Sequence, residues 1–217
     1  MMRLAFLGDS ITQGSGASNI EFCYVSQVGK MLGAKVINYG IGGTRIARQK
    51  APSIDHRHDI DFNLRTVLLD RNVDKLFVFG GTNDYGHGDA EWGKVGDTDL
   101  FTFHGAVNTL FSTLVETYGK QKIVVILPLK RANIDTNKNP TTGKYLIEYV
   151  ETIKFYAEKF GLKYIDLYNE GFSTPPEGES EFFADGLHPN DKGHRVLAEK
   201  ICEFLKTGRT YLCIHLR

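Results

Sequence analysis

Cysteine is scarce in this sequence, and its scarcity excludes two kinds of architecture. The 217 residues contain three cysteines, which lie far apart at Cys23, Cys202 and Cys213. An odd number of widely spaced cysteines argues against a disulfide framework, and no pair has the CxxC spacing of a metal or redox motif. The chain is long enough to bury a sizeable core, and we expect that core to hold the fold.

An excess of charge of one sign is also missing. Lysine plus arginine equals aspartate plus glutamate, at 26 each, so no overall field attracts nucleic acid or anionic lipid. The first apolar run, Leu4–Leu7, is too short for a secretory signal, and no stretch approaches the roughly 18 apolar residues of a membrane helix. We therefore expect a cytoplasmic protein with neither a nucleic-acid nor a membrane partner. Whether it forms a homo-oligomer stays open.

The sequence does contain a regular alternation of short apolar segments and longer amphipathic ones. Short apolar runs are typical of strands covered on both faces. The expected strands are Arg3–Leu7, Lys35–Tyr39, Lys75–Phe79, Lys122–Leu127 and Lys163–Leu167. The clearest helical periods are Leu110–Tyr118, Tyr145–Phe160 and Arg195–Leu205. This alternation predicts an α/β fold, a three-layer α/β/α sandwich around a parallel sheet of about five strands.

No linker, internal repeat or low-complexity tract interrupts this pattern, so we expect a single domain over residues 1–217, with 209–217 as a possible tail. Two polar loops, Asn133–Gly143 and Ser173–Glu181, follow the fourth and fifth strands. In an open α/β sheet, loops that leave the carboxyl ends of strands build the ligand crevice. We expect both loops to shape a pocket there.

Four short motifs place polar chemistry at this same edge of the sheet. They are "GDSIT" with Ser10, "NYGIGGTR" with Gly42 and Gly43, "GGTND" with Asn83, and "DGLHP" with Asp185 and His188. The first three follow the first three strands, and the last precedes the final helix. If the sheet is parallel, all four groups converge.

This set of residues suits acyl transfer. The hydroxyl of Ser10 becomes a nucleophile when a base such as His188 takes its proton. Asp185 lies three positions before His188, where its carboxylate reaches the other ring nitrogen and fixes the tautomer. Pro189 stiffens the turn and suits the first turn of the final helix.

The tetrahedral intermediate of acyl transfer carries an oxyanion, which needs fixed hydrogen-bond donors. The backbone N–H groups of Ser10 and of the glycine-rich turn at Gly43 are two candidate donors. The side-chain amide of Asn83 is a third. We expect these three groups to form the oxyanion hole.

Taken together, the four motifs resemble those of the SGNH hydrolases, also called the GDSL esterase/lipase family. They stand in the family's order from Gly8 to Pro189, which is nearly the whole domain. The resemblance implies a flavodoxin-like topology, Ser10 as nucleophile, and the His188–Asp185 pair as base and orienting acid. It implies Gly43 rather than Gly42 as the oxyanion donor, and no cofactor or metal. The absence of a G-x-S-x-G elbow counts against the α/β-hydrolase lipases.

Several neighbouring residues have simpler explanations. Asp9 is expected to hold the first turn by hydrogen bonds, and Asp84 to cap its helix or pair locally. His194 is expected on the final helix, away from catalysis. Arg45 is a candidate to touch substrate, or it pairs with an acid. "DHRHD", Asp55–Asp59, with His56 and His58, is interpreted as a solvated loop near the pocket rather than a metal site.

The leading functional hypothesis is a serine esterase that acts on a small-molecule ester through an acyl-enzyme. The expected cytoplasmic location and the lack of a membrane segment or a long apolar lid favour a short acyl group. The polar loop at Asn133–Gly143 suits a sugar better than a lipid tail, so an O-acetyl group on a carbohydrate is a candidate substrate. The alternatives are a lysophospholipase or thioesterase of the same family, and a binding protein that kept the fold without turnover. A flavodoxin-like nucleotide binder rests on fold likeness alone.

Overall fold

Five parallel strands form one sheet at the centre of the computed structural model, which describes residues 1–132, 136–172 and 181–208. The strands are β1 (Arg3–Gly8), β2 (Lys35–Gly40), β3 (Lys75–Phe79), β4 (Ile123–Ile126) and β5 (Lys163–Ile165). Their order is β2-β1-β3-β4-β5, which is the flavodoxin-like order. The predicted sheet is therefore confirmed, strand by strand.

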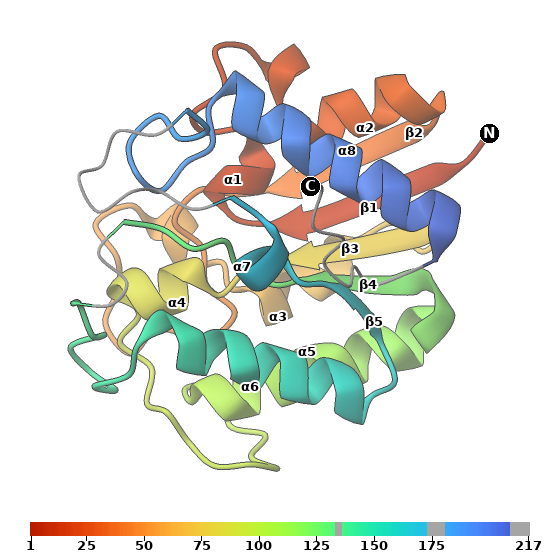
Figure 1. Ribbon diagram of the computed structural model, residues 1–217. Helices are drawn as coiled ribbons and strands as arrows, with labels where there is room; N and C mark the ends of the chain where they lie inside the picture. The colour runs from red at the N-terminus through yellow and green to blue at the C-terminus, as the bar shows by residue number, and fades with distance from the viewer. Residues whose placement is uncertain (133–135, 173–180, 209–217) are drawn as a thin grey trace.

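Helices cover both faces of this sheet and make three layers (Figure 1). Helices α2 (Tyr24–Leu32) and α8 (Asp191–Thr207) pack on one face, and α5 (Phe103–Tyr118) and α6 (Leu146–Lys159) on the other. The shorter helices are α1 (Ser10–Gln13), α3 (Phe62–Arg65), α4 (Thr82–His87) and α7 (Leu167–Glu170). The 3-10 turns are η1 (Ile20–Phe22), η2 (His56–Asp59), η3 (Thr66–Leu68) and η4 (Lys120–Lys122).

The central strands supply a separate core to each layer. Phe6 and Phe77 face α2 and α8 and stack with ring centroids 4.8 Å apart, whereas Leu7 and Val78 face α5 and α6. All four side chains are at most 2% exposed. Successive residues of a strand point to opposite faces, so a strand covered on both faces needs an apolar residue at every position. This is why the apolar runs in the sequence are continuous.

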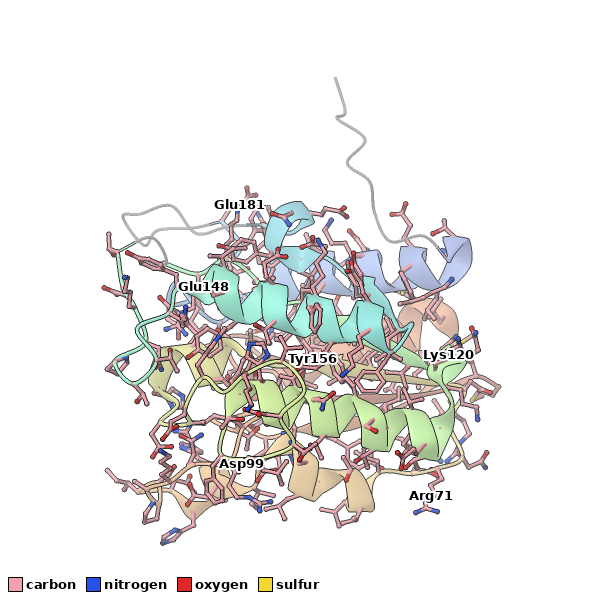
Figure 2. The ribbon with its side chains drawn as sticks, turned by 90° about the horizontal axis from the view of Figure 1, so that it is seen from below. Arg71, Asp99, Lys120, Glu148, Tyr156 and Glu181 are labelled. Atoms are coloured by element: carbon pink, nitrogen blue, oxygen red, sulfur yellow. The ribbon has the colours of Figure 1, made fainter. Side chains whose placement is uncertain are left out.

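The second face is closed by a polar contact as well as by apolar packing. Figure 2 shows Tyr156 of α6 between this helix and α5. Its hydroxyl accepts a hydrogen bond from Gly96 N at 3.1 Å and lies 3.3 Å from Nδ1 of His104 on α5. A buried tyrosine hydroxyl needs such partners, and they fix α6 against α5.

Several element boundaries differ from the predicted ones for local reasons. Helix α5 begins at Phe103 rather than near Leu110, because Thr102 caps it by accepting Gly105 N at 3.1 Å. Helix α8 begins at Asp191 with Asn190 as its N-cap. Pro189 therefore lies before the cap and not in the first helical turn, so that prediction was wrong.

The last strand is shorter than predicted. Strand β5 ends at Ile165 because Asp166 caps α7 by accepting a hydrogen bond from Asn169 N at 3.1 Å. Leu167, expected in the strand, is the first residue of α7. Among the described residues, no helix is both long and apolar enough to cross a membrane.

Candidate active site

Ser10 is the first residue of α1, immediately after the carboxyl end of β1. Asp9 caps this helix, because its Oδ1 accepts a hydrogen bond from Ile11 N at 3.0 Å. Asp9 is 1% exposed, and its burial raises the pKa of the carboxyl to about 6. The expectation that Asp9 holds the first turn is confirmed.

Helix α1 lies very close to the neighbouring strand. A Cβ atom at Gly40, the last residue of β2, would approach Gln13 N of α1 to 2.1 Å. Only glycine fits there. The turn from β1 to α1 therefore packs closely against the end of β2, and this packing fixes the direction of the Ser10 side chain.

His188 and Asp185 meet Ser10 from the other end of the chain. Ser10 Oγ lies 2.9 Å from His188 Nε2, and His188 Nδ1 lies 2.6 Å from Asp185 Oδ2. Serine, histidine and aspartate are therefore joined in one hydrogen-bonded row across 178 residues of sequence. A row of this kind is the arrangement that activates a serine hydroxyl.

The turn that carries this pair is held locally. Asp185 Oδ1 accepts hydrogen bonds from Leu187 N at 3.0 Å and His188 N at 2.7 Å. Partial burial opposes ionisation of Asp185, but the hydrogen bonds from the His188 ring and from the two backbone N–H groups outweigh it and lower the pKa. An ionised carboxylate beside Nδ1 keeps the Nδ1 proton in place, so Nε2 is free to accept from Ser10.

A glycine-rich turn after β2 supplies backbone N–H groups beside Ser10. Gly43 adopts a φ of +73°, which favours glycine. The Gly42 N–H donates to Gln13 Oε1 at 2.6 Å. Within the part of the chain that the structure describes, the N–H groups of Gly43 and Ser10 have no hydrogen-bond acceptor. Gly43, rather than Gly42, therefore retains a donor for a bound group.

Asn83 lies in α4, directly after β3, and is 3% exposed. Its Nδ2 donates to the carbonyl oxygen of Thr44 at 3.0 Å, so the amide touches the turn that contains Gly43. The structure thus brings the three predicted donor segments, at Ser10, Gly43 and Asn83, to one edge of the sheet.

Two buried charged residues that sequence reasoning did not assign to the site support this turn. Arg65 donates to the carbonyl oxygens of Gly8 at 3.0 Å and Tyr39 at 2.8 Å, and to Thr44 Oγ1 at 2.9 Å. It is 2% exposed, and burial lowers its pKa to about 10. The carbonyls at the ends of β1 and β2 thereby gain donors, and the turn is anchored beneath them.

The second of these residues is Asp84, expected to cap its own helix or pair locally. That expectation was wrong. Its carboxylate accepts hydrogen bonds from Ile46 N at 3.0 Å and Ala47 N at 2.8 Å, nearly forty residues earlier in the chain. Asp84 is 3% exposed, and burial raises its pKa to about 6 despite these bonds. The N-cap of α4 is Gly81 instead.

Arg45 follows the turn and is 6% exposed. Its Nη2 lies 2.6 Å from Nδ1 of His87, and its Nη1 donates to Ser53 Oγ at 3.3 Å. It lines a pocket of about 600 Å³ together with His58, His87 and Asp89. Arg45 therefore binds neighbouring protein groups at the margin of a pocket, and no described acid lies within ion-pair distance of it.

The segment Asp55–Asp59 forms η2 beside the site. Its His58 ring covers Gly43 so closely that a Cβ on that glycine would meet three ring atoms at 2.6 Å. His58 also lines both the 600 Å³ pocket and a pocket of about 320 Å³ that Gln13, Gly42 and Arg57 line as well. Over residues 1–132, 136–172 and 181–208, no three ligating side chains gather into a metal site.

His194 lies on α8, as expected, and is fully buried. Its Nδ1 accepts a hydrogen bond from Tyr24 N at 3.3 Å, and its Nε2 lies 3.2 Å from the carbonyl oxygen of Ser15. Burial lowers its pKa. Its two ring nitrogens are occupied by backbone groups of the segment after α1, which suits support rather than proton transfer.

The first polar loop contacts the site through its described part. Asn139 is 1% exposed and donates to the carbonyl oxygens of Asp84 at 3.2 Å, Tyr85 at 3.1 Å and Gly88 at 2.9 Å. The loop therefore packs on α4. Residues 133–135, residues 173–180 of the second loop, and the tail 209–217 lie outside the described residues.

Comparisons with known proteins agree with this geometry. The model of the GDSL-like lipase/acylhydrolase family matches residues 6–196. Among curated proteins, no significant match was found. A solved structure from Lactobacillus plantarum is 27% identical, with a TM-score of 0.80 over 96% of this chain and 98% of that one.

Two more distant structures share the fold. A lipase/acylhydrolase from Enterococcus faecalis is 21% identical, with a TM-score of 0.65 over 98% of this chain and 100% of that one. A carbohydrate acetylesterase family member from Sinorhizobium meliloti is 19% identical, with a TM-score of 0.62 over 95% of this chain and 98% of that one. With the family model spanning most of its length, the chain belongs to the GDSL-like lipase/acylhydrolase family and is an ester-hydrolysing serine hydrolase.

Proposed function

We propose that this protein is a carboxylic ester hydrolase for short acyl groups, with O-acetyl groups on a carbohydrate as its substrate class. The observation that carries the proposal is the row of Ser10, His188 and Asp185, with contacts of 2.9 and 2.6 Å. The turn that contains Gly43 approaches Ser10, since a Cβ on Gly42 would lie 3.7 Å from Ser10 Cβ, and Asn83 contacts the same turn through Thr44 O.

In the proposed mechanism, His188 Nε2 takes the proton of Ser10 Oγ as the oxygen attacks the ester carbonyl carbon. The N–H groups of Ser10 and Gly43 and the Asn83 amide bind the oxyanion that forms. The tetrahedral intermediate then collapses as the C–O bond to the alcohol breaks, and His188 returns the proton to the leaving oxygen. Asp185 stabilises the imidazolium throughout.

The acyl-enzyme on Ser10 is released by the same machinery. His188 deprotonates a water molecule, the hydroxide attacks the acyl carbon, and a second tetrahedral intermediate collapses to the free acid. The proton returns from His188 to Ser10 Oγ. The proton transfers use Ser10, His188 and Asp185, which are already hydrogen-bonded, and no step requires a cofactor.

The preference for a short acyl group and a polar alcohol rests on two pockets that adjoin the glycine-rich turn next to Ser10. His58 lines both pockets, and more than half of their lining residues taken together are polar or charged, including Gln13, Arg57 and Asp89. A long alkyl chain would leave those groups desolvated and unpaired. The similarity in fold to a carbohydrate acetylesterase family member supports the same choice.

The test is the hydrolysis of p-nitrophenyl esters of increasing acyl length, followed by acetylated oligosaccharides, by wild type and Ser10→Ala. We expect acetate to be cleaved faster than octanoate, acetate to be released from the oligosaccharide, and both activities to vanish in Ser10→Ala. Faster cleavage of octanoate would favour a lysophospholipase or thioesterase. No turnover by a folded wild type would favour a binding protein.

A further inference from the structure

One hydrogen-bonded chain behind the oxyanion donors is not used by the proposed mechanism. Asn83 and His87 lie four residues apart in α4, and Asn83 Oδ1 is 3.1 Å from His87 Nε2. On the far side of the ring, His87 Nδ1 is 2.6 Å from Nη2 of Arg45. The chain therefore runs from Arg45 through His87 to Asn83, with the side-chain amide at its end.

The chemistry of arginine fixes the direction of every proton in this chain. A guanidinium only donates hydrogen bonds, so His87 Nδ1 must accept, and the single ring proton must lie on Nε2. That Nε2–H donates to Asn83, which requires the amide oxygen to face His87. The pKa of His87 is lowered to about 4, mainly by burial and secondly by the nearby positive charge of Arg45. The ring is therefore neutral at pH 7.

The orientation of the Asn83 amide decides whether it stabilises an oxyanion or repels it. With the oxygen turned to His87, Nδ2 faces the glycine-rich turn, where one of its protons goes to Thr44 O at 3.0 Å. The second proton of Nδ2 has no acceptor among the described residues. A flipped amide would place its oxygen against the carbonyl of Thr44 and toward the oxyanion. Only one of the two orientations is useful for catalysis.

Arg45 is buried with only part of its guanidinium paired, by donation to Ser53 Oγ and His87. It is 6% exposed, and its Nε has no hydrogen-bond partner in the described part of the chain. None of the ion pairs formed by the described residues includes it, and burial lowers its pKa. A buried, incompletely paired guanidinium lowers stability, and the contact with His87 gives this one a role in orienting the ring.

We propose that Arg45 and His87 are positioning residues that hold the Asn83 amide with its Nδ2 toward the oxyanion. They act through Asn83 and do not touch the reacting atoms. The inference rests on the proposed function, since it assigns Asn83 a role in the tetrahedral intermediate. It also explains why a histidine follows the "GGTND" motif at the spacing of one helical turn.

The test compares His87→Leu with His87→Gln, using p-nitrophenyl acetate and thermal melting. Leucine removes both ring nitrogens, whereas glutamine keeps an acceptor for Arg45 and an amide N–H for Asn83. We expect His87→Leu to lower kcat about 10- to 100-fold, with little change in KM. This is no more than the effect of losing one oxyanion donor altogether. His87→Gln should stay within a few fold of wild type. Arg45→Met should follow His87→Leu in direction.

A double-mutant cycle with Asn83→Ala separates positioning from a general structural role. If His87 acts through Asn83, His87→Leu has no further effect on kcat once Asn83 is alanine. An equal drop in both backgrounds, or full activity of His87→Leu, would overturn the inference. If Ser10→Ala abolishes turnover while His87→Leu does not lower it, only the positioning role fails. Turnover that persists in Ser10→Ala overturns the proposed function as well.

Discussion

The two halves of the candidate site are built in opposite ways. The acid–base segment, residues 182–190, is held largely by bonds within itself: the Asp185 side chain hydrogen-bonds only to Leu187 and His188 among the described residues, and it is 54% exposed. The oxyanion segment, residues 41–47 with α4, is held by buried groups from distant parts of the chain. Asp84 reaches back to Ile46 N, and Asn83 to Thr44 O.

This difference separates activity from stability. A substitution in the acid–base segment removes a functional group from an exposed turn, so it should lower the rate and leave the fold intact. A substitution in the oxyanion segment leaves a buried hydrogen-bond partner unsatisfied, which costs about 1–3 kcal/mol of folding free energy. Such a substitution should lower both the rate and the stability. The predictions below test this contrast.

The largest effect is expected from His188→Ala in the acid–base segment. Without the base at 2.9 Å from Ser10 Oγ, kcat for p-nitrophenyl acetate should fall by about 10⁴-fold or more. The melting temperature, followed by circular dichroism, should stay within a few degrees of wild type. Residual activity within tenfold of wild type would exclude His188 as the base.

Asn83→Ala, in the oxyanion segment, should lower both kcat and the stability of the fold. Loss of one oxyanion donor lowers kcat by about 10²–10³-fold, and the buried carbonyl of Thr44 loses its donor. The free energy of unfolding, from urea denaturation, should fall by about 1–3 kcal/mol.

A matched control for that variant is Asn108→Ala in α5. Asn108 is 9% exposed, its Nδ2 donates to the carbonyl oxygen of Asp97 at 2.9 Å, and its Oδ1 accepts from Lys159 Nζ at 3.1 Å. It should lose similar stability with kcat unchanged. If both variants lower kcat alike, the rate effect of Asn83→Ala would be a consequence of destabilisation alone.

Asp185→Asn should lower kcat by a smaller factor, about 10²-fold, without loss of stability. The replacement removes the charge beside His188 Nδ1, and its amide can donate to Nδ1 and so favour the tautomer with the proton on Nε2. The effect is limited because solvent reaches the half-exposed carboxylate and screens its contribution. Steady-state kinetics and urea denaturation measure the two quantities. A stability loss comparable to that of Asn83→Ala would contradict the contrast between the segments.

The last prediction concerns stability and not the rate, because Asp9 makes the free energy of unfolding depend on pH. Its pKa is about 6 in the folded protein and 3.8 ordinarily, so the folded state binds an extra proton between these values. The stability that this provides is present below about pH 4 and is lost as pH rises through 6, by up to roughly 3 kcal/mol. Asp9→Asn, whose Oδ1 still accepts Ile11 N, should lack this loss. The measurement is urea denaturation of wild type and Asp9→Asn at pH 4.5 and 7.5. An equal change in the free energy of unfolding between the two pH values in both proteins would contradict the prediction.

The acid–base segment could be predicted from sequence because its contacts are local. Asp185 and His188 stand three residues apart in one turn, so their spacing alone indicates that the carboxylate reaches the ring. The strands were predictable too, because their apolar runs are continuous and short. Helix α5 was recognised only in its second half, since Gly105 and the polar His104 and Asn108 interrupt its apolar period.

The support of the oxyanion segment was not predictable in the same way. Arg65, Asp84 and His87 act on residues brought near by the sheet order, and an isolated charged residue in a sequence gives no sign of a partner 21 to 57 residues away. Arg45 was expected to touch substrate or pair with an acid; the contact of its guanidinium with His87 was not foreseen, and its contact with substrate stays a prediction. Long-range polar contacts of this kind depend on the finished fold.

The central claim is that the contact between Ser10 and His188 makes Ser10 the activated nucleophile. The most direct measurement is intact-mass spectrometry after treatment with a small fluorophosphonate, on wild type and Ser10→Ala in parallel. The account predicts one adduct on wild type, located at Ser10 by peptide mapping, and none on the variant. A folded wild type that stays unlabelled, or an adduct that persists in Ser10→Ala, would contradict it.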